Sequence, residues 1–328
     1  MILKIFTYIF YIRFTCSHLG IIINMYIFQT LCVRKNSREQ NNTMSIKTKK
    51  KALFIYTVLS LIAGLAFTVY RTALLKQNYD PYSASFEHGA AGVFRTYEYA
   101  LIAVALVLST SIFFIKKIKL QLFSARYSTT SVSICAICGF IFAATAILLT
   151  VNYSDIIFNL YSNSLAHSVL YIIALVAMLL SALYFIGCAS TRMQKSCAKP
   201  YLSLFPTIFC ALYMGASYFD TDYLFYDFNH ITSQIAFMAM MLFMLAEANL
   251  ATDQNAYRLY FAMSLVCIVC VSAHVIPLLL LVSFWEIKAT IPITTELASI
   301  GILIYAILSA FNAVRTLENA DGQDSTLQ

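Results

Sequence analysis

The sequence contains few charged residues. Aspartate, glutamate, lysine and arginine make up 11% of its 328 residues, whereas soluble domains usually carry about 25%. Hydrophobic residues make up 60%, and the mean hydropathy is +0.76. This composition excludes an ordinary soluble domain and indicates that lipid surrounds most of the chain. The usual estimate of domain number from chain length therefore does not apply.

Glycine is also scarce, at nine residues, which leaves little room for glycine-rich loops that bind phosphate groups. The sequence has no Gly-x-x-x-x-Gly-Lys, His-Glu-x-x-His or Gly-x-Ser-x-Gly motif. It therefore predicts no ATPase or kinase domain and no cofactor. Without a catalytic motif, the sequence does not favour an enzyme.

Nine cysteines are present, but their positions do not predict a disulfide framework. None lies in a predicted outer loop. Two Cys-x-x-Cys pairs occur inside apolar runs without a basic neighbour that would favour the thiolate, so we expect small buried hydrophobic side chains rather than redox or zinc sites. The cysteines of the apolar runs are Cys135, Cys138, Cys210, Cys267 and Cys270, and a basic loop holds Cys188 and Cys197.

Eight apolar runs follow Met44, each near the roughly 20 residues that cross a bilayer as a helix. They are continuously apolar rather than alternating, which favours helices over a barrel. The sequence therefore predicts an all-α, polytopic membrane helix bundle over residues 44–315, followed by a polar, disordered cytoplasmic tail at 316–328. The predicted spans are 52–70, 96–114, 129–150, 165–186, 201–216, 231–250, 259–283 and 294–314.

Residues 1–43 form a doubtful N-terminal extension. Met44, a lysine-rich segment and a clean apolar run follow one another, which is typical of the start of a bacterial inner-membrane protein. We interpret 1–43 as a mis-assigned start. The alternative is an extra membrane span within this extension.

Basic residues predict the orientation in the membrane. Thirteen lysines and arginines fall in one set of connecting segments, and four fall in the other: Arg71, Lys76, Arg95 and Lys288. By the positive-inside rule, both ends of the main body are cytoplasmic. The basic residues occur in short runs between spans, so the net charge of +7 indicates contact with the lipid bilayer and not with nucleic acid.

The predicted outer face is acidic and rich in tyrosine, and its acids include Glu98 and Glu296. One of the outer connections carries a candidate cation site, since carboxylates and an imidazole suit a divalent metal. The plainer interpretation is a solvated loop, and the spacing fails the EF-hand pattern because Leu224 and Phe225 occupy ligand and glycine positions. The candidate site consists of Asp220, Asp222, Asp227 and His230.

Three polar residues within the spans, Gln234, Glu247 and His274, form a candidate polar cavity. An ionisable group inside a membrane span indicates a functional site by default. Pro277 cannot donate a hydrogen bond to the carbonyl of Ala273, so a helix kink next to His274 is expected. The plainer interpretations are a neutral His274 satisfied by the freed carbonyl, and a Glu247 at the interface that pairs with Arg258.

Three functions remain open on this sequence. The first is a transporter-like or solute-binding protein with an acidic outer mouth, in which Pro206 and Pro277 permit broken helices. The second is a sensory or scaffolding subunit that contacts a membrane protein partner or a second copy of itself. The third is an intramembrane enzyme acting on a lipid, which would need two titratable groups within hydrogen-bond reach.

Overall fold

The computed structural model describes residues 46–80, 85–86, 91–115, 129–158, 165–190, 199–219, 228–252, 256–285 and 293–324. The chain divides into two compact units, Met1–Met44 and Ser45–Gln328. All described residues belong to the second unit. The doubtful extension at 1–43 and three acids of the candidate cation site (Asp220, Asp222 and Asp227) lie outside the described residues.

The described part of the second unit is helical apart from one short antiparallel strand pair, β1 (Tyr79–Asp80) with β2 (Ser85–Phe86). Seven helices are long and apolar enough to cross a membrane, which confirms the predicted polytopic helix bundle. The helices are α2 (Ile46–Asn78), α3 (Ala91–Phe113), α4 (Thr129–Phe158), α5 (Leu165–Cys188), α7 (Lys199–Leu202), α8 (Leu204–Phe219), α9 (Phe228–Thr252), α10 (Tyr257–Trp285) and α11 (Ile293–Asp324).

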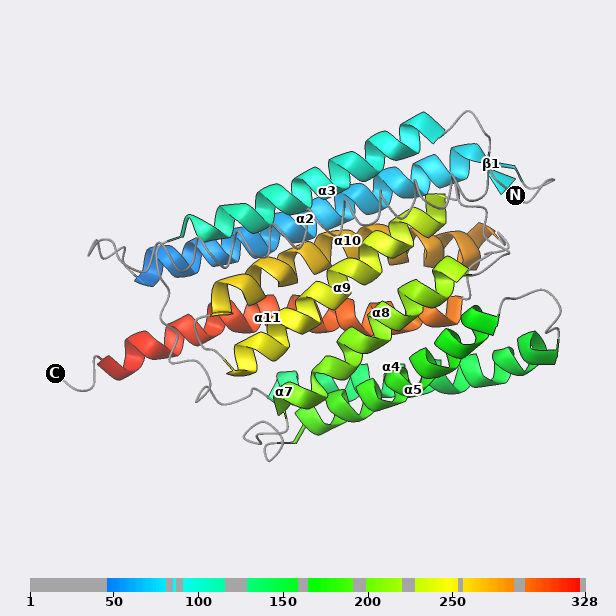
Figure 1. Ribbon diagram of the computed structural model, residues 1–328. Coiled ribbons are helices and arrows are strands. Elements are labelled where there is room, and N and C mark those ends of the chain that lie inside the picture. Colours follow the sequence, from blue (N-terminus) through cyan, green and yellow to red (C-terminus); the bar gives the residue numbers. More distant parts are fainter. Residues whose placement is uncertain are drawn as a thin grey trace. The chain divides into compact units, whose positions relative to one another are not determined.

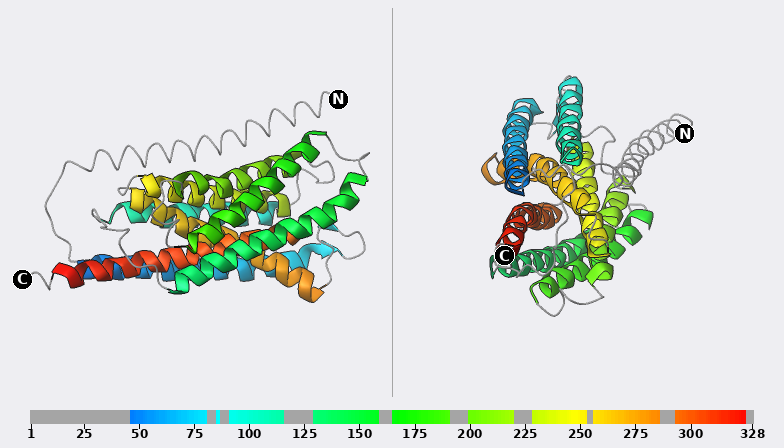
Figure 2. Two further views of the ribbon diagram at one scale, coloured as in Figure 1. Left: turned by 90° about the horizontal axis from the view of Figure 1, so that it is seen from below. Right: turned by 90° about the vertical axis from the view of Figure 1, so that its left-hand side faces the viewer.

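Six of these helices pack into a closed ring in the order α4, α5, α8, α9, α10 and α11, with α11 returning to α4. Helices α2 and α3 lie side by side outside the ring and pack on α10 (Figures 1 and 2). We call the end of the bundle where α2 stops and α3 starts the Asn78 end. The end where α9 stops and α10 starts is the Thr252 end.

Helix α10 is the central element because it contacts α2, α3, α9 and α11. Apolar residues occupy all of its faces, as expected for a helix that is buried on every side. In its apolar segment 78% of the residues are buried, compared with 28% in α2. The many exposed leucines, isoleucines and valines of α2 therefore form a lipid-facing surface.

Aromatic side chains fill the centre of the six-helix ring. Phe142 of α4 packs against Phe185 of α5 and Phe209 of α8, with ring centroids 5.1 and 5.8 Å apart. Phe185 in turn lies 5.2 Å from Tyr305 of α11, and Phe209 lies 6.2 Å from Phe237 of α9. The interlocked rings hold five helices in register, because large rigid side chains have few alternative ways to pack.

One glycine sets the closest approach within the ring. A Cβ atom on Gly139 of α4 would lie 2.5 Å from a side-chain carbon of Ile186 and 3.1 Å from the carbonyl oxygen of Ala182, both on α5. Only a residue without a side chain fits between these backbones, as in other close helix pairs in membranes. Gly139 therefore marks a close contact between α4 and α5.

The structure corrects three predicted boundaries. Helix α2 continues to Asn78, so Arg71 is helical and not part of an outer loop. Helix α11 continues to Asp324 instead of ending in a disordered tail after Val314, since the segment after the apolar run contains helix-forming leucine, glutamate and alanine and no proline. The predicted fifth span is broken at Ser203 into α7, with 4 residues, and α8, with 16 residues, because Pro206 cannot donate to the carbonyl four residues earlier.

Candidate functional site

A histidine, an arginine and a carboxylate meet inside the bundle near the Asn78 end. His274 of α10 is fully buried, and Arg71 of α2 and Glu296 of α11 are each only 1% exposed. Nη1 of Arg71 lies 3.1 Å from Nδ1 of His274, and Nε2 of His274 lies 3.0 Å from Oε1 of Glu296. Three helices therefore supply one chain of bonded ionisable groups.

The chemistry of the donors assigns the protons of this chain. A guanidinium can only donate hydrogen bonds, so Nδ1 of His274 must accept from Arg71. The ring hydrogen then sits on Nε2, which donates to the Glu296 carboxylate. In this arrangement the imidazole is neutral, and the positive charge of Arg71 balances the negative charge of Glu296.

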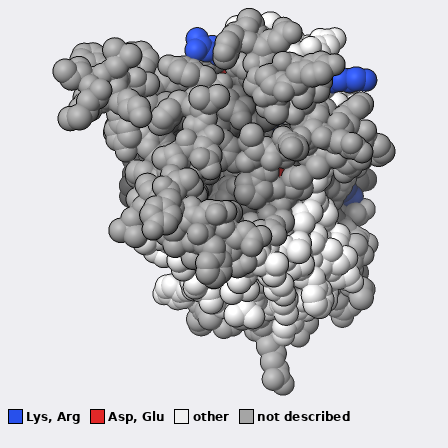
Figure 3. All heavy atoms as spheres, turned by 90° about the vertical axis from the view of Figure 1, so that its right-hand side faces the viewer, with Lys and Arg blue, Asp and Glu red and all other residues white. Residues whose placement is uncertain are grey.

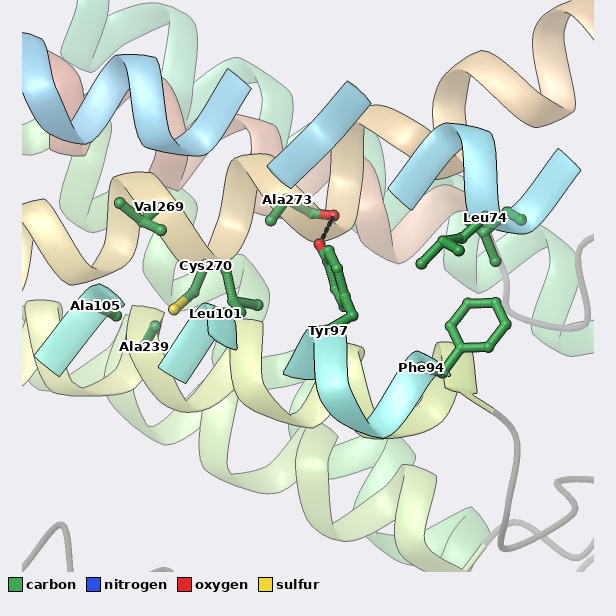
Figure 4. Packing of buried hydrophobic residues seen from close by; sticks show 10 residues of the cluster. Leu74, Phe94, Tyr97, Leu101, Ala105, Ala239, Val269, Cys270 and Ala273 are labelled. Carbon is green, nitrogen blue, oxygen red and sulfur yellow. Dashed lines mark hydrogen bonds between the residues drawn. The ribbon is translucent and has the colours of Figure 1, made fainter. Parts of the chain in front are cut away.

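Pro277 changes the backbone hydrogen bonding next to this histidine. It leaves the carbonyl of Ala273, four residues earlier, without its usual helical donor. That carbonyl instead accepts hydrogen bonds from Tyr97 Oη of α3 and from Arg71 Nη1, each at 3.4 Å. Figure 4 shows the Tyr97 hydroxyl directed from α3 toward Ala273 on α10. The freed carbonyl thus joins α2, α3 and α10 at one point.

Several buried oxygen atoms at this end have no hydrogen-bond partner within the described part of the chain. They are Oε2 of Glu296, Oγ of Ser299 and Oε1 of Glu98. Ser299 follows Glu296 by one turn of α11, so these two oxygens lie near each other. Glu98 lies within electrostatic range of Arg71 and Arg95. Buried polar atoms are normally paired, so unpaired ones indicate where water or a polar solute binds.

A second buried cluster lies toward the Thr252 end and contains Glu247 of α9. Its Oε1 atom accepts hydrogen bonds from Tyr184 of α5 at 2.7 Å and from Tyr305 of α11 at 2.5 Å. Glu247 is 5% exposed, so its side chain lies in the interior of the bundle. The expected pairing with Arg258 is not among its described hydrogen bonds, and both Glu247 Oε2 and Arg258 Nη2 are buried without a hydrogen-bond partner among the described residues.

The third residue of the predicted cavity, Gln234, has separate neighbours. Its amide donates to Ser217 Oγ of α8 at 2.7 Å and to the carbonyl of Met214 at 3.4 Å. Among the described hydrogen bonds, none connects Gln234, Glu247 and His274 with one another. The three residues thus belong to three separate sets of contacts. His230 lies in the first turn of α9.

Sequence reasoning missed most partners of these residues. It assigned Arg71, Glu98 and Glu296 to the outer surface and gave no role to Tyr184 or Tyr305. A usable signal was present for Arg71, since apolar residues flank it on both sides in Val69-Tyr70-Arg71-Thr72-Ala73-Leu74. Glu98 and Glu296 likewise fell within the predicted spans 96–114 and 294–314.

The cysteines of the two Cys-x-x-Cys pairs are buried thiols, as predicted for small hydrophobic side chains. Cys138 donates a hydrogen bond to the carbonyl of Gly301 at 3.2 Å, which links α4 to α11. Among the described residues, no group of three or more histidine, cysteine or acidic side chains is arranged to hold a metal ion.

The charged side chains that are described at the Asn78 end differ in exposure. Lys76 and Arg95 are exposed, and the described basic atoms visible in the view onto this end lie near its edge (Figure 3). Arg71 and Glu296, in contrast, are buried. The buried charges are thus distinct from the surface charges that orient a protein in a membrane.

Comparison of the chain with protein-family models, with curated proteins and with solved structures finds no match.

Proposed function

We propose that this multi-pass membrane protein is a proton-coupled transporter, and that the Arg71–His274–Glu296 cluster is its coupling site. The observation that carries the proposal is the buried His274, bonded through both ring nitrogens to groups of opposite charge. Charged groups inside a membrane domain are costly and are kept where they move protons, ions or solutes. A surface-facing histidine would not support this function.

The assigned tautomer supports a coupling mechanism. Nδ1 of His274 is the free base of the cluster, and Arg71 donates to it. A proton that binds to Nδ1 takes the place of that hydrogen bond, and two positive charges then face each other. Proton uptake therefore releases Arg71 from His274. Because Arg71 and His274 lie on α2 and α10, the release changes how these helices are held together.

Oε2 of Glu296 and Oγ of Ser299 support a solute site beside the proton site. Both atoms are buried and lack a hydrogen-bond partner within the described residues. A small polar solute that donates two hydrogen bonds would satisfy them. The affinity for this solute would then depend on whether His274 carries an extra proton. Coupled transport requires such a dependence.

The test is a rapid pH change on proteoliposomes adsorbed to a solid-supported membrane, with the displaced charge recorded. The native protein is expected to give a transient current that empty vesicles lack. His274→Gln retains an acceptor for Arg71 and a donor for Glu296 but cannot bind a proton, so the current should disappear. Lys76→Gln, an exposed change at the same end, should leave it unchanged. A native protein indistinguishable from empty vesicles would contradict the proposal.

A membrane sensory or scaffolding subunit is the second candidate. The interlocked aromatic side chains at the centre of the six-helix ring favour it, because a packed centre opposes a wide solute pathway. In that case the pH change gives no current. A third candidate, an enzyme acting on a lipid, is favoured only by the two titratable groups at 3.0 Å, His274 and Glu296, and both are buried away from the lipid.

A further inference from the structure

The Glu247 cluster is a second place in the described part of the chain where an ionisable group is buried, and here no described counter-charge is hydrogen-bonded to it. We propose that Glu247 holds an exchangeable proton on Oε2, so that Glu247, Tyr184 and Tyr305 form a second proton-binding site. The proposal rests on the proposed function, because a proton-coupled transporter would move the proton that Glu247 binds.

The distribution of hydrogen bonds between the two carboxyl oxygens carries the proposal. Both tyrosine hydroxyls donate to Oε1, and Oε2 is buried without a hydrogen-bond partner in the described part of the chain. The two oxygens of an ionised carboxylate are equivalent acceptors, and an unpaired one is strongly disfavoured in a buried site. In a neutral carboxyl group the carbonyl oxygen is the better acceptor, and the other oxygen carries the proton. Two donors on Oε1 match the neutral acid, and an unpaired neutral hydroxyl on Oε2 costs less than an unpaired charged oxygen.

The surroundings favour the same state. The titratable groups that act electrostatically on the two tyrosines come from α4, α5 and α10 as well as from α11. Besides Glu247 they are Cys135, Tyr184, Cys188, Tyr260 and Tyr305. None of these described groups is a cation, and Arg258 makes no described hydrogen bond to Glu247. The phenols and thiols are neutral at physiological pH. A carboxylate at this position would therefore lack a bonded counter-ion.

The position of the site relates it to the first cluster. Helix α11 contributes Glu296 to one cluster and Tyr305 to the other, nine residues further along the chain, which is about 13 Å along the helix axis. The two proton sites thus lie at different depths in the bundle, with Glu296 of α11 toward the Asn78 end and Glu247 of α9 toward the Thr252 end. Acidic groups at successive depths are the arrangement from which proton relays in membrane proteins are built.

Infrared difference spectroscopy on the full chain in lipid nanodiscs at neutral pH tests the proposal. We expect a carbonyl stretch of a protonated carboxyl group, shifted on exchange into D₂O. The band should be absent from Glu247→Gln and retained in His274→Gln. Tyr184→Phe and Tyr305→Phe keep the ring and the carboxyl group and remove only the hydroxyl. Each should move the band to higher wavenumber because the carbonyl oxygen loses one hydrogen bond.

An identical carboxyl spectrum for the native protein and Glu247→Gln would overturn the proposal. An unmoved spectrum in both tyrosine variants would do the same, even if Glu247→Gln failed to fold. These outcomes are separate from those of the pH-change experiment. The band can be present in a protein that gives no current, and a current that depends on His274 can persist when Glu247 is ionised.

Discussion

At the residue scale, the main feature is a neutral imidazole between a guanidinium and a carboxylate. Removing one member of a buried ionic group leaves the other charge uncompensated, and this costs more than the intact group contributes. Arg71 has a further structural role, since it also donates to the carbonyl of Ala273 that Pro277 leaves free. The arginine therefore serves both the charge balance and the backbone of α10.

We expect Arg71→Met to lower the stability of the detergent-solubilised protein by about 3–5 kcal/mol, because Glu296 would remain buried without a balancing cation. Arg95→Met is the matched control, since Arg95 is exposed on α3 at the same end of the bundle. Its effect should stay within about 0.5 kcal/mol. Thermal unfolding followed by circular dichroism measures both. Equal losses of stability in the two variants would contradict the assignment of the effect to the burial of Arg71.

At the element scale, close backbone contacts and broken helices decide how the bundle packs. Gly139 allows α4 to approach α5. Pro206 and Pro277 act differently on their helices: the first lies just after the break between α7 and α8, whereas α10 remains continuous through Pro277. The difference follows from the neighbours, since Arg71 and Tyr97 supply donors to the carbonyl that Pro277 frees.

Gly139→Ala should destabilise the protein by about 1–3 kcal/mol, the usual cost of adding a methyl group to a filled interior. The new Cβ atom would meet backbone atoms of α5, which cannot rotate away. The same substitution at Gly92 is the control, because a Cβ atom there has no neighbour within 4 Å. The melting temperature of Gly92→Ala should match or slightly exceed that of the native protein; a similar fall in both would contradict this account of α4–α5 packing.

At the scale of the whole molecule, the six-helix ring and its two outer helices form a membrane-spanning bundle with buried polar clusters at two depths. The sequence predicts that the Asn78 end faces outward, because few basic residues lie in the connections there. This orientation remains a prediction, and it determines from which side a proton reaches each cluster.

Reporter fusions test the orientation. Alkaline phosphatase fused after Asp222 should be active, since the enzyme folds only outside the cytoplasm, and green fluorescent protein fused after Lys117 should fluoresce. Exchanging the two reporters should give inactive fusions at both sites. Activity of one and the same reporter at Asp222 and Lys117 would place both connections in one compartment and contradict the alternating topology.

Composition and hydropathy alone predicted the class of protein and nearly all of the helices, because an apolar run of about 20 residues has few stable alternatives to a membrane helix. The prediction of a functional His274 also came from the sequence, since an ionisable residue in an apolar run is conspicuous. The helix boundaries were less predictable. Arg71 and Glu296 were assigned to the surface because a hydropathy profile contains no information about which helices pack against a residue.

Only the tertiary structure decided which polar groups meet. Arg71, His274 and Glu296 are separated by 203 and 22 residues along the chain, and their contact depends on the rotation and pairing of α2, α10 and α11. Glu247 likewise obtained two tyrosines from α5 and α11 instead of Arg258. Hydropathy reports the depth of a residue in the membrane, but the face of a helix and its neighbours result from side-chain packing, which a linear pattern does not contain.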